Sequence, residues 1–184
     1  MIRSFLNKKL SEEDERRIIE NIFRGPSAGF SQGVEILVLK GDERESVYEL
    51  WGEKAKRRAE YPLSEGIEKA PLVIVFFVSK KRYEERYMRR DKDHYIADNS
   101  WPAPFWFIDA GMSILLGLLS SVDAGLGALF TGIKNAEKLH EKFGVPSSYT
   151  SVGILSIGYT DPNYRSHTRI QRRELEDCTH YGRW

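Results

Sequence analysis

The segment that most constrains the fold of this chain is an unbroken run of apolar residues, Leu72-Val73-Ile74-Val75-Phe76-Phe77-Val78. A run of this kind is typical of a β-strand that is buried on both faces. Further strand patterns occur at 34–40, 128–131 and 151–159, and helical patterns occur at 11–24, 43–58, 80–90, 105–124 and 135–143. Since neither an internal repeat nor a linker interrupts these patterns, the sequence predicts one α+β or α/β domain.

Composition narrows the classes of function. The 28 lysines and arginines are balanced by 27 aspartates and glutamates, and the net charge of +1 argues against binding to nucleic acid or to an anionic membrane. A single cysteine, Cys178, excludes an internal disulfide framework and a cysteine-built zinc site. The four histidines are scattered without ligand spacing, so we expect no metal site. These properties predict a soluble protein of a reducing compartment, the cytoplasm.

One segment, 105–119, has the apolar character of a membrane span. It contains Asp109 and is shorter than the ~20 residues that a bilayer requires, so we expect it to form the buried central helix of a soluble domain. The start of the chain, residues 1–9, lacks the apolar stretch and the small-residue cleavage site of a secretory signal. We therefore expect neither a membrane anchor nor secretion.

The connection between the first predicted helix and the first predicted strand is unusual. It reads Pro26-Ser27-Ala28-Gly29-Phe30-Ser31-Gln32-Gly33, which is longer than a plain connection requires. Small residues, hydroxyls and an amide are concentrated there, so its backbone donors and the Gln32 side chain could grip a polar planar ligand. An ordinary surface loop is the alternative interpretation.

Arginines are clustered near both ends of the chain. Arg3 lies at the start, and Arg165, Arg169, Arg172 and Arg173 lie near the end. Guanidinium groups match the geometry of a phosphate monoester, so these residues are candidates for holding one. A solvated charged tail is the alternative.

Taken in chain order, these features resemble the flavin-dependent nitroreductase family. The opening Arg3-Ser4-Phe5-Leu6 and the helix start at 11–14 are similar to the beginning of that family, and residues 26–32 are similar to its flavin-binding loop. Further similarities lie at 70–71, 109–124, 125–127, 157–159 and 172–177. The resemblance implies a three-layer α/β/α fold of the α+β class, with a central mixed, mainly antiparallel sheet. It also implies an intertwined homodimer in which an arm, about 160–184, reaches the partner.

The resemblance further implies an FMN at each of two sites that are built from both subunits. Arg3 and either Arg172 or Arg173 would hold the phosphate, and the backbone of Leu126 and Gly127 would lie near flavin N5. No side chain is expected to be catalytic, because N5 carries the chemistry. The full set of implied cofactor-binding residues is Arg3, Ser4, Pro26, Ser27, Ala28, Gly29, Ser31, Gln32, Gly125, Leu126, Gly127, Arg172 and Arg173.

The implied activity is a ping-pong hydride transfer from NADH or NADPH to a nitroaromatic, a quinone or a similar electron-poor acceptor. We expect Tyr87, Trp101 and Trp106 to wall the acceptor pocket, with packing at a dimer interface as the alternative role. Phe30 stands where the family usually has asparagine, and Gly33 where proline is common. These departures leave open a deazaflavin-using relative, a reductive dehalogenase, and a non-catalytic flavin store or sensor of the same fold.

Overall fold

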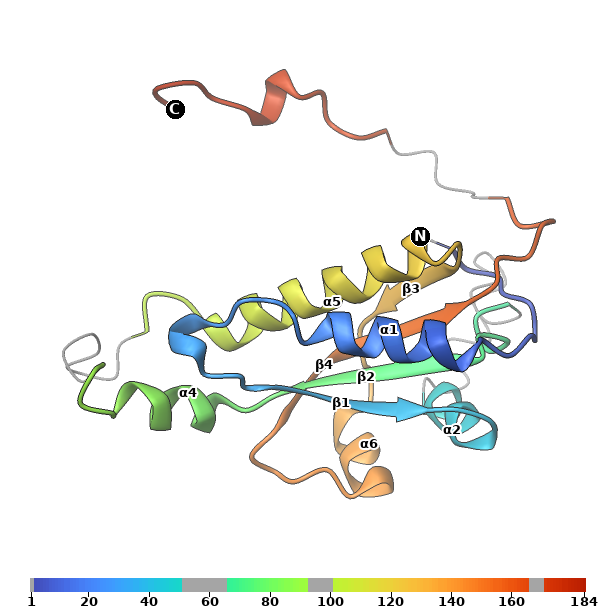
Figure 1. The fold of residues 1–184 in the computed structure, drawn as a ribbon, viewed down its shortest axis with the longest axis horizontal. Helices are drawn as coiled ribbons and strands as arrows, with labels where there is room; N and C mark the ends of the chain where they lie inside the picture. Colours follow the sequence, from blue (N-terminus) through green and yellow to red (C-terminus); the bar gives the residue numbers. More distant parts are fainter. Residues whose placement is uncertain (1, 51–65, 93–100, 166–170) are drawn as a thin grey trace.

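The computed structural model describes residues 2–50, 66–92, 101–165 and 171–184 (Figure 1). Its centre is a four-stranded sheet in the order β1-β2-β4-β3. The strands are β1 (Val34–Leu39), β2 (Leu72–Val78), β3 (Gly127–Thr131) and β4 (Thr150–Gly158). The mainly antiparallel sheet is confirmed, and all pairs among these four strands are antiparallel.

Helices cover both faces of the sheet. The first face carries α1 (Glu12–Ile22) and α5 (Phe105–Asp123), and the second carries α2 (Asp42–Glu49) and α6 (Ala136–Phe143). Alternate side chains of β2 enter the two cores, and every residue of that strand is buried. The strand buried on both faces and the three-layer α/β/α fold are therefore confirmed.

Local signals in the sequence set the ends of several elements. Ser11 caps α1 by accepting the Asp14 N–H at 3.0 Å, and α6 ends at Gly144, whose φ of +64° favours glycine. Asn135 precedes α6 as expected, but its side-chain amide donates to the carbonyl of Leu50 rather than capping the helix. The helix predicted at 43–58 is confirmed as α2, and its remainder from residue 51 lies outside the described residues.

Helix α5 differs from the expected wholly buried helix, because only its inner face is covered. Gly117 allows a close approach to the sheet, since a Cβ atom there would lie 2.8 Å from Leu155 Cδ2. On the outer face, Leu115, Leu119 and Val122 are 53%, 55% and 66% exposed. By length and composition α5 would also suffice to cross a membrane, but it packs against α1 and the sheet.

Three further elements lie outside the helices that cover the sheet. Helix α4 (Lys80–Tyr87) follows β2, and the short 3₁₀ turn η1 (Ala28–Phe30) lies beside α4. After β4 the chain leaves the compact body, and a second 3₁₀ turn, η2 (Glu176–Cys178), lies in this C-terminal arm (Figure 1).

Candidate functional site

The loop from Pro26 to Gly33 is anchored to a buried carboxylate. Asp109, 3% exposed on the first turns of α5, accepts the backbone N–H of Ala28 at 2.9 Å and the Tyr83 hydroxyl at 2.6 Å, both through Oδ2. Burial, and then the hydrogen bond to Asp109, raise the pKa of Tyr83 well above its usual range. Tyr83 therefore stays a neutral donor, and Asp109 joins α4, α5 and the loop.

The same loop contains strained backbone. Phe30 has a φ of +58° and Gln32 a φ of +52°, in the left-handed region that side chains other than glycine rarely occupy. Phe30 is also 73% exposed, although its ring is large and apolar. Strain of this kind persists only where surrounding contacts enforce it, and it is concentrated at ligand sites.

Two tyrosine rings of α4 pack so closely against the loop that they leave no room for a side chain at Gly29 or Gly33. Tyr83 and Tyr87 lie four residues apart and therefore share a face of the helix. A Cβ atom at Gly29 would lie 2.8 Å from Tyr87 Cε2, and one at Gly33 would overlap Tyr83 Cε2. Arg86 strengthens the contact by donating from Nε to the Gly29 carbonyl at 2.7 Å. The loop and α4 thus form one packed unit.

We expect Gly33→Ala to lower the free energy of unfolding by about 1–3 kcal/mol, because the added methyl group would overlap the buried Tyr83 ring. Urea denaturation measures this loss. Gly132→Ala is the control, since a Cβ atom at Gly132 would meet nothing within 4 Å, and its stability is expected to change by less than about 0.5 kcal/mol. Equal stability of the two variants would contradict the packing described above.

Most of the loop's backbone donors are already in use. Ala28 donates to Asp109, Phe30 to the Ser27 carbonyl, Ser31 to the Ala28 carbonyl and Gln32 to Ser27 Oγ. Fewer backbone N–H groups are therefore left to bind a ligand than the loop's sequence predicted. Within the described parts of the chain, the exposed side-chain amide of Gln32 has no hydrogen-bond partner and is available to a ligand.

The aromatic residues of the predicted acceptor pocket lie beside this unit and pack mainly on one another. The ring centroid of Trp101 lies 4.9 Å from that of Tyr87 and 5.8 Å from that of Trp106, and both pairs are edge to face. The buried Trp101 Nε1 finds no acceptor among the residues that the structure describes. Their role in acceptor binding stays a prediction.

A second group of predicted site residues lies at the other end of α5. Ile2 donates its N–H to the Ala128 carbonyl at 3.2 Å, which places the opening residues beside Gly127. The Ser4 hydroxyl donates to Asp161 at 3.1 Å. The Leu126 N–H donates to the Ser121 carbonyl at 2.8 Å, so a ligand would have to compete with that bond.

One chain does not bring the two groups together. From Asp109, which anchors the first group, to Asp123, after which the second group begins, α5 spans about 21 Å at ~1.5 Å per residue. The remaining predicted residues, Arg172 and Arg173, lie in the C-terminal arm away from both (Figure 1). Arg173 donates there to the carbonyl of Asp177.

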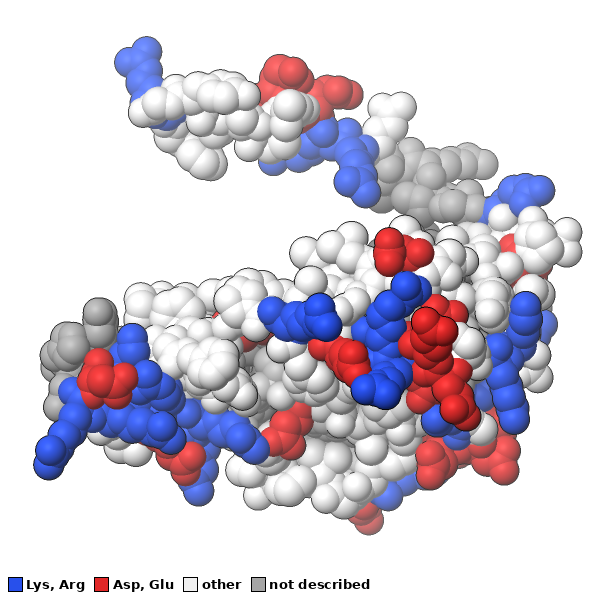
Figure 2. All heavy atoms as spheres, viewed as in Figure 1, with Lys and Arg blue, Asp and Glu red and all other residues white. Residues whose placement is uncertain are grey.

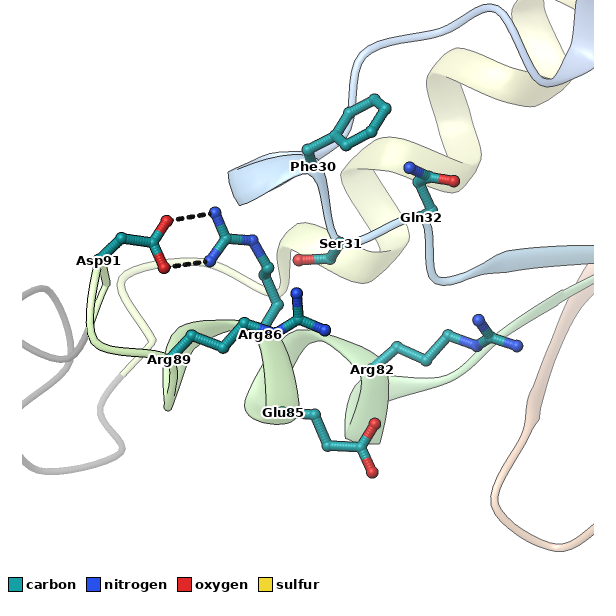
Figure 3. A pocket seen from close by; sticks show the side chains of 8 residues that line it. All are labelled: Phe30, Ser31, Gln32, Arg82, Glu85, Arg86, Arg89 and Asp91. Carbon is teal, nitrogen blue, oxygen red and sulfur yellow. Dashed lines mark hydrogen bonds and ion pairs between the residues drawn. The ribbon is translucent and has the colours of Figure 1, made fainter.

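A groove between the loop and α4 was not predicted from the sequence. Its volume is about 460 Å³, and we call it the α4 groove. In this groove Arg86 donates two hydrogen bonds to the Asp91 carboxylate, of 2.9 and 2.7 Å (Figure 3). Figure 2 shows lysine and arginine side chains gathered over α4. The groove is lined by Phe30, Ser31, Gln32, Arg82, Glu85, Arg86, Arg89 and Asp91.

A signal for this groove is present in the sequence. Arg82, Arg86 and Arg89 are spaced four and three residues apart, a spacing typical of one helix face, although α4 ends at Tyr87 and Arg89 follows it. Among the described residues, no group of three His, Cys, Asp or Glu side chains could hold a metal ion.

Comparison with known proteins identifies the fold and the family. A profile of the Nitroreductase family matches residues 1–159. Nitroreductase CinD from Lactococcus lactis, solved in complex with chloramphenicol, is 21% identical, with a TM-score of 0.77 over 97% of this chain and 93% of that chain. An FMN-dependent nitroreductase from Clostridium difficile R20291 is 19% identical, with a TM-score of 0.68 over 100% of this chain and 94% of that chain.

A nitroreductase family protein from Clostridium difficile 630 is also similar, at 19% identity and a TM-score of 0.71 over 100% of this chain and 93% of that chain. None of the curated proteins matches the sequence. At these identities the solved structures show the shared fold, whereas the profile shows membership over most of the chain. The chain therefore belongs to the nitroreductase family and is an oxidoreductase.

Proposed function

We propose that the protein is an FMN-dependent NAD(P)H oxidoreductase that acts as a cytoplasmic homodimer. One observation carries the proposal: the residues implied for a single flavin site form two groups, at opposite ends of α5. A second copy, placed so that its loop meets the first copy's Arg3 and Gly127, would complete the site. A twofold dimer would then contain two equivalent sites.

The exposed face of α5 supports this dimer. Its largest side chains form a stripe along the helix, with exposed fractions of 41% to 66%. Soluble proteins rarely leave an apolar stripe of this length in water unless it binds a partner. The stripe consists of Phe107, Ile108, Leu115, Leu119 and Val122.

Several side chains fit FMN. The guanidinium groups of Arg3 and Arg172 have no hydrogen-bond or ion-pair partner among the described residues, so both are free to hold a phosphate. The Gln32 amide is free for the polar edge of the flavin ring or for its ribityl chain. The Asp109 anchor holds Pro26, Ser27 and Gly29 in place at the N-terminal end of α5, whereas Arg3 lies near its C-terminal end.

FMN, when bound, would supply the hydride transfer from a nicotinamide to an electron-poor acceptor, in a ping-pong sequence. The protein's part would be to bind and orient the cofactor and the two substrates in turn, without an acidic or basic side chain. The names of the similar solved proteins, which include an FMN-dependent nitroreductase, support this assignment.

An absorption spectrum followed by anaerobic titration with NADH and NADPH tests the proposal. We expect flavin bands in the purified protein and their bleaching by at least one nicotinamide. Arg3→Gln is expected to weaken FMN binding by about tenfold, since a guanidinium–phosphate contact is lost, whereas Arg16→Gln on the exposed face of α1 is expected to leave it unchanged.

The contrary outcomes separate the alternatives. A yellow protein that neither nicotinamide bleaches would favour a flavin store or sensor. A protein that stays colourless after incubation with FMN would overturn the flavin assignment. A deazaflavin-using relative would bind that cofactor in preference to FMN.

A further inference from the structure

The α4 groove adjoins the proposed flavin site, because Ser31 and Gln32 belong to both, whereas the arginines of the groove have no part in the flavin site. Pro26 to Gly29, which we assign to the flavin, come just before these two residues in the same loop. A concave site of about 460 Å³ falls within the usual range for small-molecule pockets. The groove therefore lies where a substrate of a bound flavin would extend.

Two of its three arginines are already compensated. Arg86 is held by both oxygens of Asp91 and by the Gly29 carbonyl. Arg82 is paired with Glu35 at 2.5 Å, on neighbouring strand β1. These two guanidinium groups build and stiffen the groove, because their partners belong to separate segments of the chain.

Arg89 is different. No hydrogen bond or ion pair to its guanidinium is formed by any residue within the described ranges. Figure 3 shows its side chain extending into the groove beneath Ser31, while the Glu85 carboxylate points away. The groove thus contains one uncompensated positive charge with fork geometry.

We infer that the α4 groove binds the oxyanion of a substrate, either a carboxylate or a phosphate, through the guanidinium group of Arg89. The exposed Phe30 ring at its rim would cover the planar part of the same molecule. The inference rests on the proposed function, because it assigns a substrate class to that oxidoreductase. The oxyanion has two sources: an acidic electron acceptor, or a phosphate of the nicotinamide nucleotide.

Two matched pairs of ligands test the inference in the full-length protein. The first pair is 4-nitrobenzoate and 4-nitrobenzamide, which have nearly the same shape and differ in charge. The second pair is NADP+ and NAD+, which differ by one phosphate and cannot reduce the flavin. Isothermal titration calorimetry gives the dissociation constants for the wild type, for Arg89→Gln and for Arg90→Gln, an exposed neighbour that does not line the groove.

For the acceptor source, we expect the wild type to bind the benzoate about tenfold more tightly than the benzamide. Arg89→Gln should reduce that ratio to about twofold or less, and Arg90→Gln should keep it. The ratio should also fall as NaCl is raised, because salt screens the exposed charge. For the nucleotide source, the ratio of NADP+ affinity to NAD+ affinity should show this behaviour instead.

If Arg89→Gln changes neither ratio, or if Arg90→Gln changes them equally, the inference is wrong. Calorimetry reads binding without turnover, so failure of the reductase assignment would be seen separately, in the nicotinamide titration. A protein that bleaches with NADH but shows no charge preference would keep the proposed function and lose the oxyanion site.

Discussion

Asp109→Ala is expected to destabilise the fold by about 4 kcal/mol and to weaken FMN binding at least about tenfold. The carboxylate accepts two hydrogen bonds from buried or partly buried donors, and each bond to a charged group contributes ~1.5–3 kcal/mol. Its removal leaves the Ala28 N–H and the Tyr83 hydroxyl without their acceptor. The loop from Pro26 to Gly33 would then lose its fixed position. Urea denaturation and flavin titration measure the two effects.

Graded variants separate the anchor from a general loss of packing. Tyr83→Phe removes one of the two bonds, so it should cost about half as much as Asp109→Ala. Asp123→Ala removes a carboxylate from the other end of α5, where the side chain is 81% exposed and its ion pair with Arg17 is 3.9 Å long. We expect that variant to stay within about 0.5 kcal/mol of the wild type. If it were as unstable as Asp109→Ala, the anchor role would be wrong.

The second large effect concerns the outer face of α5. The double variant Leu115→Arg/Leu119→Arg is expected to be monomeric and to lack flavin, because two charges would be buried in the dimer interface. We expect the dissociation constant of the dimer to rise at least about a hundredfold. Both side chains are more than half exposed in one chain, so the monomer should keep its helical circular dichroism.

A matched control introduces the same two arginines elsewhere. Glu137→Arg/Glu141→Arg has the same four-residue spacing on α6. This helix covers the other face of the sheet, and both of these side chains are exposed. That variant should remain a flavin-containing dimer in sedimentation velocity. A monomeric wild type that binds FMN would remove the need for a second copy.

Much of the fold follows from local sequence patterns. The apolar run of β2 predicts a strand covered on both faces, and the cap at Ser11 and the glycine at 144 predict helix ends that the structure confirms. Such signals are readable because they depend on neighbouring residues alone. The open outer face of α5 was not predicted, because an apolar helix looks the same whether it is buried within one chain or between two.

Less of the site could be predicted from the sequence, because the site depends on contacts between residues that are far apart along the chain. The loop's composition indicated a ligand, but its internal hydrogen bonds and its anchor at Asp109 depend on contacts between residues about 80 positions apart. Arg82, Arg86 and Arg89 have the pattern of an ordinary charged helix, and only the folded chain brings Ser31 and Gln32 to the same groove. Spacing alone does not show which loop lies opposite a helix.

The most direct test of the central claim is the flavin content of heterodimers made from two defective chains. One chain carries Arg3→Glu and the other Asp109→Ala, and co-expression with two different tags allows the mixed dimer to be purified. If each site takes Arg3 from one copy and the Asp109-anchored loop from the other, the mixed dimer contains one intact site. It should therefore bind about half the flavin of the wild type, although each homodimer binds little.

If each site were built within a single chain, every site of the mixed dimer would carry one defect. Its flavin content would then be no higher than the mean of the two defective homodimers. That result would contradict the site shared between two copies.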